Sequence, residues 1–106
     1  MAGAKIVVIY PPPTDKEAFE KIYADEHLPL ASNKISGKTK VVLGKVVGPG
    51  GNPPFHRIVE IHFPSMEALQ VSLASEGTQE AAAHAQSIST GGPITMLICD
   101  EQTVTF

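Results

Sequence analysis

The chain has one cysteine, no tryptophan and no long hydrophobic run in its 106 residues. A single cysteine cannot form an intrachain disulfide, and Cys99 has no basic neighbour in sequence, so we expect an inert buried thiol. The longest apolar run near the N-terminus, residues 6–10, is too short for a signal peptide or a membrane span. These absences predict a cytoplasmic protein that does not act at a membrane.

Charge is also sparse, with 18% charged residues and a formal net charge of −3. Lysine and arginine are scattered and form no basic run, which argues against a nucleic-acid partner. The glycine- and proline-rich loop at 48–54 lacks the lysine and the following helix of a phosphate-binding loop. A hydrophobic fraction of 42% in a chain of this length predicts a single globular domain over residues 1–106.

The hydrophobic pattern alternates between strand and helix along the chain. Two segments, residues 5–10 and 94–99, are apolar on both faces, and 39–47 and 55–63 also read as strands. Helices are predicted at 14–27, 66–74 and 79–88. The resulting βαββαβ order predicts an α+β, ferredoxin-like fold with an antiparallel sheet and its helices on one face of that sheet.

The predicted sheet has a second face that helices do not cover. Strands 5–10 and 94–99 place apolar side chains on both faces, so this second face is too apolar to remain in water. The simplest cover is the same face of another copy, giving a homodimer in which two sheets form a dimeric α+β barrel. The tail at 100–106 ends in Val104 and Phe106, and we expect it to pack on the partner subunit as well.

The helix at 14–27 carries the best single indication of function. Phe19, Tyr23 and His27 are spaced by four residues and therefore share one face, which also includes Ile22. Pro29 is expected to end or kink the regular helix just after His27. An unperturbed histidine titrates near neutral pH and is suited to proton transfer, so His27 is the candidate acid/base and Tyr23 a candidate substrate-binding residue.

The strand at 55–63 divides its side chains between two faces. Val59 and Ile61 should meet the helices, whereas Ile58, Glu60 and His62 should face the barrel interior. We therefore predict that these three bind substrate in a cavity shared with His27. A metal site is not expected, because residues on one straight strand, such as His56, Glu60 and His62, rarely converge on one ion.

The segment FEKIYADEHLPL at 19–30, preceded by a strand that ends in Tyr10 and Pro11, resembles the EthD family, named for ethyl tert-butyl ether degradation. The segment FPSMEALQVSLAS at 63–75, followed by an alanine-rich stretch, strengthens the resemblance, which covers nearly the whole chain. It implies a ferredoxin-like dimeric α+β barrel with a pocket near His27. It also implies an enzyme or accessory protein in the catabolism of small organic molecules, or in aromatic and polyketide chemistry.

The chain departs from the family pattern after the alanine-rich stretch. Members of the family often have an Asp-x-x-Asn-Phe segment there, whereas this chain has His84-Ala85-Gln86-Ser87-Ile88. If that aspartate orients or activates the helix histidine, its role must be filled differently here, or the chemistry has changed. From the residues alone, His84 reads as structural or exposed.

Two classes of function remain open at this point. The first is a cofactor-independent isomerase, cyclase or monooxygenase, with His27 moving the proton and Tyr10 or His62 holding a substrate oxygen. The second is a non-catalytic carrier or accessory protein of a catabolic pathway that uses the same cavity. Both bind a small, mostly apolar, oxygen-bearing molecule and need no cofactor; a haem-binding barrel is a weaker third possibility.

Overall fold

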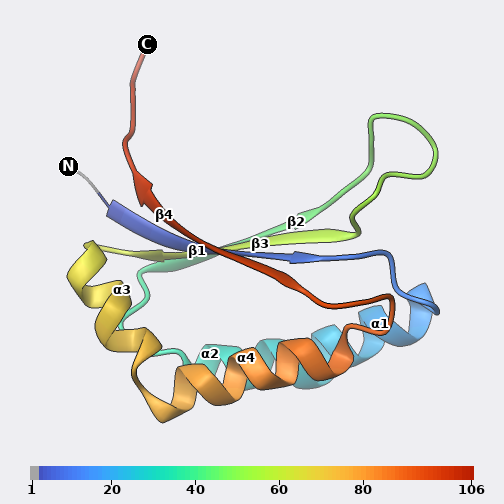
Figure 1. Cartoon of the computed structure of the whole chain (residues 1–106), viewed down its shortest axis with the longest axis horizontal. Helices are drawn as coiled ribbons and strands as arrows, with labels where there is room; N and C mark the ends of the chain where they lie inside the picture. Colours follow the sequence, from blue (N-terminus) through green and yellow to red (C-terminus); the bar gives the residue numbers. More distant parts are fainter. Residues whose placement is uncertain (1–2) are drawn as a thin grey trace.

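A computed structural model describes residues 3–106, in which helices cover one face of a four-stranded antiparallel sheet and leave the other face open (Figure 1). The strand order is β2-β3-β1-β4, so the first and third strands are central. This confirms the ferredoxin-like α+β fold. The elements are β1 (Gly3–Tyr10), α1 (Lys16–Ile22), η1 (Tyr23–His27), α2 (Leu28–Lys34), β2 (Lys40–Lys45), β3 (Arg57–Phe63), α3 (Met66–Leu73), α4 (Glu76–Ile88) and β4 (Thr95–Glu101).

The core lies between the sheet and the helices. Alternate residues of β1 are buried, from Ala4 to Tyr10, and the intervening ones are half-buried on the open face. Ile6 pairs with Ile61 and Val8 with Val59, so the two central strands present one apolar surface to the helices. The predicted alternation in β3 is therefore confirmed for the helix-facing side.

The first helix is longer than the sequence predicted. It does not end at His27 but passes through a π-helical turn, Tyr23–His27, and continues as α2 to Lys34. In the wide turn the Leu28 amide donates to the Tyr23 carbonyl, and Pro29 follows within the first turn of α2, where a missing N–H is tolerated. The chain therefore does not leave the helix at Pro29, although the regular α-helix is interrupted by the π turn just before it.

Two other helix boundaries also differ from expectation. Helix α1 begins at Lys16 rather than at residue 14, and Asp15 caps it, with its carboxylate accepting a 3.1 Å bond from the Ala18 amide. Helix α4 begins earlier than predicted, because Ser75 caps it through the Thr78 amide. The earlier start packs the first turn of α4 against the end of α2. A Cβ added at Gly77 would lie only 2.4 Å from the Lys34 carbonyl oxygen.

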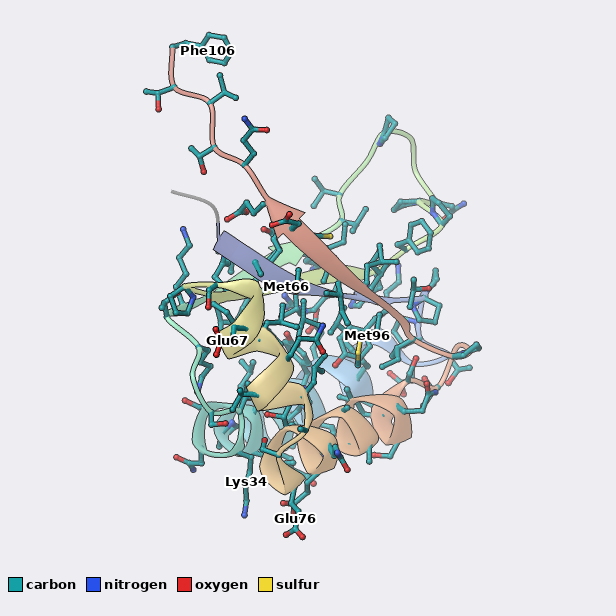
Figure 2. The ribbon with its side chains drawn as sticks, turned by 60° about the vertical axis from the view of Figure 1, so that its left-hand side comes forward. Lys34, Met66, Glu67, Glu76, Met96 and Phe106 are labelled. Carbon is teal, nitrogen blue, oxygen red and sulfur yellow. The ribbon has the colours of Figure 1, made fainter. Side chains whose placement is uncertain are left out.

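The open face of the sheet and the C-terminal tail are both apolar and unpaired in one copy of the chain. Val42 of β2 and Leu97 of β4 are more than 40% exposed there. Beyond β4 the tail runs away from the body of the molecule and ends at Phe106 (Figures 1 and 2). None of the helices in the described part of the chain is long and apolar enough to cross a membrane.

Candidate functional site

An aromatic cluster joins the end of β1 to the inner face of the first helix. The Tyr10 ring meets Phe19 and Tyr23 edge to face, with centroids 5.2 and 5.7 Å away. Phe19 stacks on Tyr23 and Tyr23 stacks on His27, each pair at 5.6 Å. Spacing by four residues therefore does what the sequence predicted: it aligns Phe19, Tyr23 and His27 on one inward face.

The cluster forms part of the wall of a cavity of about 350 Å³ between the helices and the sheet. This volume is in the range of small-molecule pockets. Tyr10, Tyr23 and His27 all contribute to the wall, and Met96 reaches it from β4 on the helix side of the sheet (Figure 2). The rest of the wall is mainly aliphatic. It comprises Ile6, Val8, Leu28, Ala31, Ser32, Ile35, Lys38, Val41, Leu43, Val59, Ile61, Leu73, Thr78, Gln79, Ala81, Ala82 and Ala85.

His27 is paired with a second histidine that the sequence analysis treated as structural. Its Nδ1 lies 2.9 Å from Nδ1 of His84 on α4, and the two rings are nearly parallel, with centroids 5.2 Å apart. His84 is half-buried and does not line the cavity. The signal that could have found it is its spacing from Ala81 and Ile88, three residues before and four after, which are buried on α4.

Burial sets the protonation of the polar groups in the cavity wall. Burial lowers the pKa of His27 from 6.5 to about 4, and the nearby His84 adds to the effect, so the imidazole is neutral at neutral pH. Burial likewise raises the pKa of Tyr23 to about 12 and keeps its hydroxyl protonated. That hydroxyl is buried without a hydrogen-bond partner among residues 3–106. A buried hydroxyl without a hydrogen-bond partner costs folding free energy unless a ligand accepts its hydrogen bond.

Behind the aromatic cluster, a carboxylate holds two basic side chains of the strand β3 region. Glu20 accepts bonds from Arg57 Nε at 3.0 Å and Arg57 Nη2 at 3.1 Å, and its Oε1 lies 3.2 Å from His56 Nε2. The Arg57 guanidinium lies 4.9 Å from the centroid of the Tyr23 ring. Glu20, His56 and Arg57 thus support the ring of Tyr23, a role that the sequence analysis did not predict.

Glu60 and His62 do not line the cavity that contains His27, so the prediction of a shared cavity is wrong. Both, with Ile58, lie on the open face of the sheet, opposite the helix-facing Val59 and Ile61. The cavity is on the helix side, because a helix residue packs on the sheet face that its helix covers.

Glu60 and His62 instead belong to a charged network on the open face. Lys5 Nζ lies 2.9 Å from Glu60 Oε1 and 3.1 Å from Glu101 Oε2. His62 Nε2 lies 3.2 Å from Glu60 Oε1, at an angle that does not make a hydrogen bond. Donor atoms of Glu60, His62 and Glu101 fall within 4.8 Å of one another, and the Lys5 ammonium contacts both carboxylates and offsets one of their two negative charges.

The model of the EthD domain matches residues 11–88, which include the whole helix that carries His27. The chain belongs to the EthD family. An uncharacterized 11.0 kDa protein from the thcB-thcC intergenic region of Rhodococcus erythropolis is 33% identical over 101 residues, covering 94% of this chain and 96% of that protein. An EthD family protein of Bacillus halodurans is 27% identical, with a TM-score of 0.85 over 94% of this chain and 99% of that one.

More distant structures share the fold of this EthD protein. Hydroxynitrile lyase from Passiflora edulis superposes with a TM-score of 0.71 at 16% identity, covering 97% of this chain and 96% of the lyase. At this identity the likeness establishes the architecture alone.

Proposed function

We propose that the helix-side cavity binds a small, mostly apolar, oxygen-bearing organic molecule and that the protein transforms it without a cofactor. In this proposal His27 is the acid/base, while Tyr23 or Tyr10 holds the substrate oxygen. The observation that carries it is a neutral imidazole and a buried, unpaired phenol in the wall of a largely aliphatic cavity. Such a cavity favours an apolar body with one or two oriented polar atoms.

The two groups suit removal of a proton next to a carbonyl or phenolic oxygen. His27 Nδ1 is engaged by His84, so Nε2 is the nitrogen that remains for a molecule in the cavity. A neutral Nε2 with a lone pair accepts the substrate proton, and the Tyr23 hydroxyl donates a hydrogen bond to the oxygen on which negative charge develops. The same step begins isomerisation, cyclisation and cofactor-free oxygenation, so the cavity is compatible with each of these reaction classes.

Relatives by fold support chemistry without a cofactor. SnoaB of Streptomyces nogalater, described as a cofactor-independent oxygenase, shares the fold with a TM-score of 0.63 at 12% identity. A carrier or accessory function is the second candidate, favoured by the aliphatic wall and by the low pKa of His27, which makes it a weak base. Glu60, His62 and Ile58 remain candidates for binding only in an assembly that encloses the open face.

The function is tested by screening neutral cyclic ketones, lactones and phenols for a rise in melting temperature, then following each hit by chromatography and mass spectrometry. We expect at least one hit to be converted, and His27→Gln to slow conversion roughly 10²–10⁴-fold while still binding it. Glu67→Gln, on the exposed side of α3, is the control and should keep full activity. Hits that bind both proteins equally and are never converted would support the carrier instead.

We further propose a homodimer formed by the open sheet faces and the C-terminal tail. The apolar exposure of this face supports it, as does a fold relative from Jannaschia sp. CCS1 described as dimeric, with a TM-score of 0.65 at 15% identity. In the tail, Val104 is 64% exposed and Phe106 is fully exposed. Burying both on a partner would contribute about 2–4 kcal/mol.

Removing the two apolar tail side chains is therefore expected to weaken the dimer. Because each subunit of the dimer contributes one tail, the double variant Val104→Ser and Phe106→Ser should raise the dimer dissociation constant about a thousandfold or more, measured by analytical ultracentrifugation. Val71→Ser is the matched control, because Val71 is equally exposed but lies on α3, away from the open face. An unchanged dissociation constant would mean that the tail does not contribute to the interface, and a monomeric parent protein would overturn the dimer itself.

A further inference from the structure

We infer that His84 is a positioning and relay residue, which fixes the tautomer of His27 and carries protons between the cavity wall and solvent. The inference rests on the proposed function only in treating His27 as the group that meets the substrate. It goes beyond that function by assigning a second histidine, on a different helix, to the path of the proton. The observation that carries it is the 2.9 Å approach of the two Nδ1 atoms.

The geometry couples the protonation of the two rings. A hydrogen bond between two Nδ1 atoms needs a proton on one and a lone pair on the other. When both rings are neutral, one must therefore carry its proton on Nδ1 and the other on Nε2. Either His27 donates and its Nε2 is a free base, or His84 donates and His27 Nε2 carries a proton that it can give to the cavity. His84 thus decides whether His27 acts as base or acid.

Proton transfer through the pair balances without any other group. Substrate gives a proton to His27 Nε2, and the N–H bond on His27 Nδ1 breaks as one forms on His84 Nδ1. His84 is then cationic, and it releases its Nε2 proton to water because this ring is half-buried rather than enclosed. The cavity has lost one proton, solvent has gained one, and both rings are neutral with their tautomers exchanged. The reverse sequence returns a proton to the product.

The surroundings of His27 favour a neutral ring. Tyr23 stacks on His27 from η1, and Tyr10 of β1 contacts Tyr23; both are protonated phenols. Arg57, over the Tyr23 ring, is a fixed cation. On α4, Glu80 lies one turn before His84 and is paired with Lys34 at 3.5 Å. Burial and the neighbouring His84 both disfavour a lasting charge on His27, so a proton that reaches His27 is passed on.

Imidazole ¹⁵N chemical shifts and long-range ¹H–¹⁵N correlations test the coupling in the intact protein, without any substrate. We expect His27 and His84 to show opposite neutral tautomers at pH 7.5. In His84→Ala, His27 should adopt the Nε2–H form preferred by a free histidine side chain, and its titration midpoint should rise by about 0.5 or more. The control His84→Ala with Ala83→His keeps the composition of the helix but moves the ring to an exposed position, and it should behave like His84→Ala.

Two results would overturn the relay. One is the same tautomer on both rings in the parent protein; the other is an unchanged His27 tautomer and midpoint in His84→Ala. Once a converted substrate is known, His84→Ala should lower kcat about tenfold or more and change its pH profile, with KM little affected. If the rings are coupled but His27→Gln retains turnover, the proposed function fails while the coupling stands. If the rings are uncoupled but His27→Gln is inactive, the coupling fails while the proposed function stands.

Discussion

Replacing Gly91 with alanine should destabilise the protein by about 2–4 kcal/mol, the largest stability effect that we expect from a single methyl group. A Cβ at Gly91 would lie 1.8 Å from the Pro12 carbonyl oxygen and 2.8 Å from its carbon. Both atoms belong to the backbone, so no rotamer change can relieve the contact. Gly91 is therefore required for space, because its backbone conformation is not left-handed.

The clash would displace two backbone segments that hold the candidate site in place. The loop that precedes β4 packs against the proline turn after β1, where the Thr14 amide donates a 3.1 Å bond to Thr90 Oγ1. The same proline turn follows Tyr10, one of the tyrosines of the cavity wall. Pushing these backbones apart would loosen the end of β1 and the beginning of β4 together.

Urea unfolding followed by far-UV circular dichroism, at one fixed protein concentration, measures this change. A loss of this size should also lower the melting temperature by roughly 10 °C or more. Gly51→Ala is the matched control, because no atom lies within 4 Å of its added Cβ, and its stability should change by less than about 0.5 kcal/mol. Equal stability of the Gly91 and Gly51 variants would show that the two backbones separate at little cost.

Local patterns in the sequence were sufficient for the fold and for the inward face of the first helix. The alternation in β3 correctly assigns Val59 and Ile61 to the helices, and spacing by four aligns Tyr23 with His27. Both are short-range geometric rules. The family resemblance is confirmed by the match to the EthD domain over residues 11–88.

The features that the sequence did not predict correctly depend on contacts between distant segments. The pairing of His84 with His27 joins residues 57 positions apart, and no periodicity within α4 specifies which ring it will meet. The side of the sheet on which the cavity forms depends on how α2 and α4 spread over the strands. The continuation of the helix past Pro29 required a π turn, which has no sequence signature of its own.

Stability is expected to fall by about 2–3 kcal/mol between pH 7.5 and pH 4, because of His27 alone. Its pKa is lowered from 6.5 to about 4 in the folded protein by burial, and secondly by His84. In this window the unfolded chain binds a proton that the folded chain does not, so protonation favours unfolding. This destabilisation by His27 is absent above about pH 7, grows as pH falls through 6.5, and levels off near pH 4.

The carboxylates of the open-face network act at lower pH and can be separated from this effect. Lys5 lowers the pKa of Glu60 and of Glu101 below 4.5. Their contribution to stability is present above that value and is lost as pH falls through the lowered folded values. A decline that is already marked at pH 5.5 therefore reports on a histidine rather than on these carboxylates.

Urea unfolding at half-unit steps from pH 7.5 to 4.5 tests the role of His27. His27→Phe, which keeps a ring to stack on Tyr23, should remove most of the decline. The stability of the variant relative to the parent protein should therefore be higher at pH 4.5 than at pH 7.5. Tyr23→Phe is the control, because it deletes an unpaired hydroxyl and leaves His27 in place, and it should keep the parental slope. If His27→Phe retains that slope, the imidazole must be accessible enough to hold a proton in the folded protein. His27 would then not be the buried, neutral base on which the proposed chemistry depends.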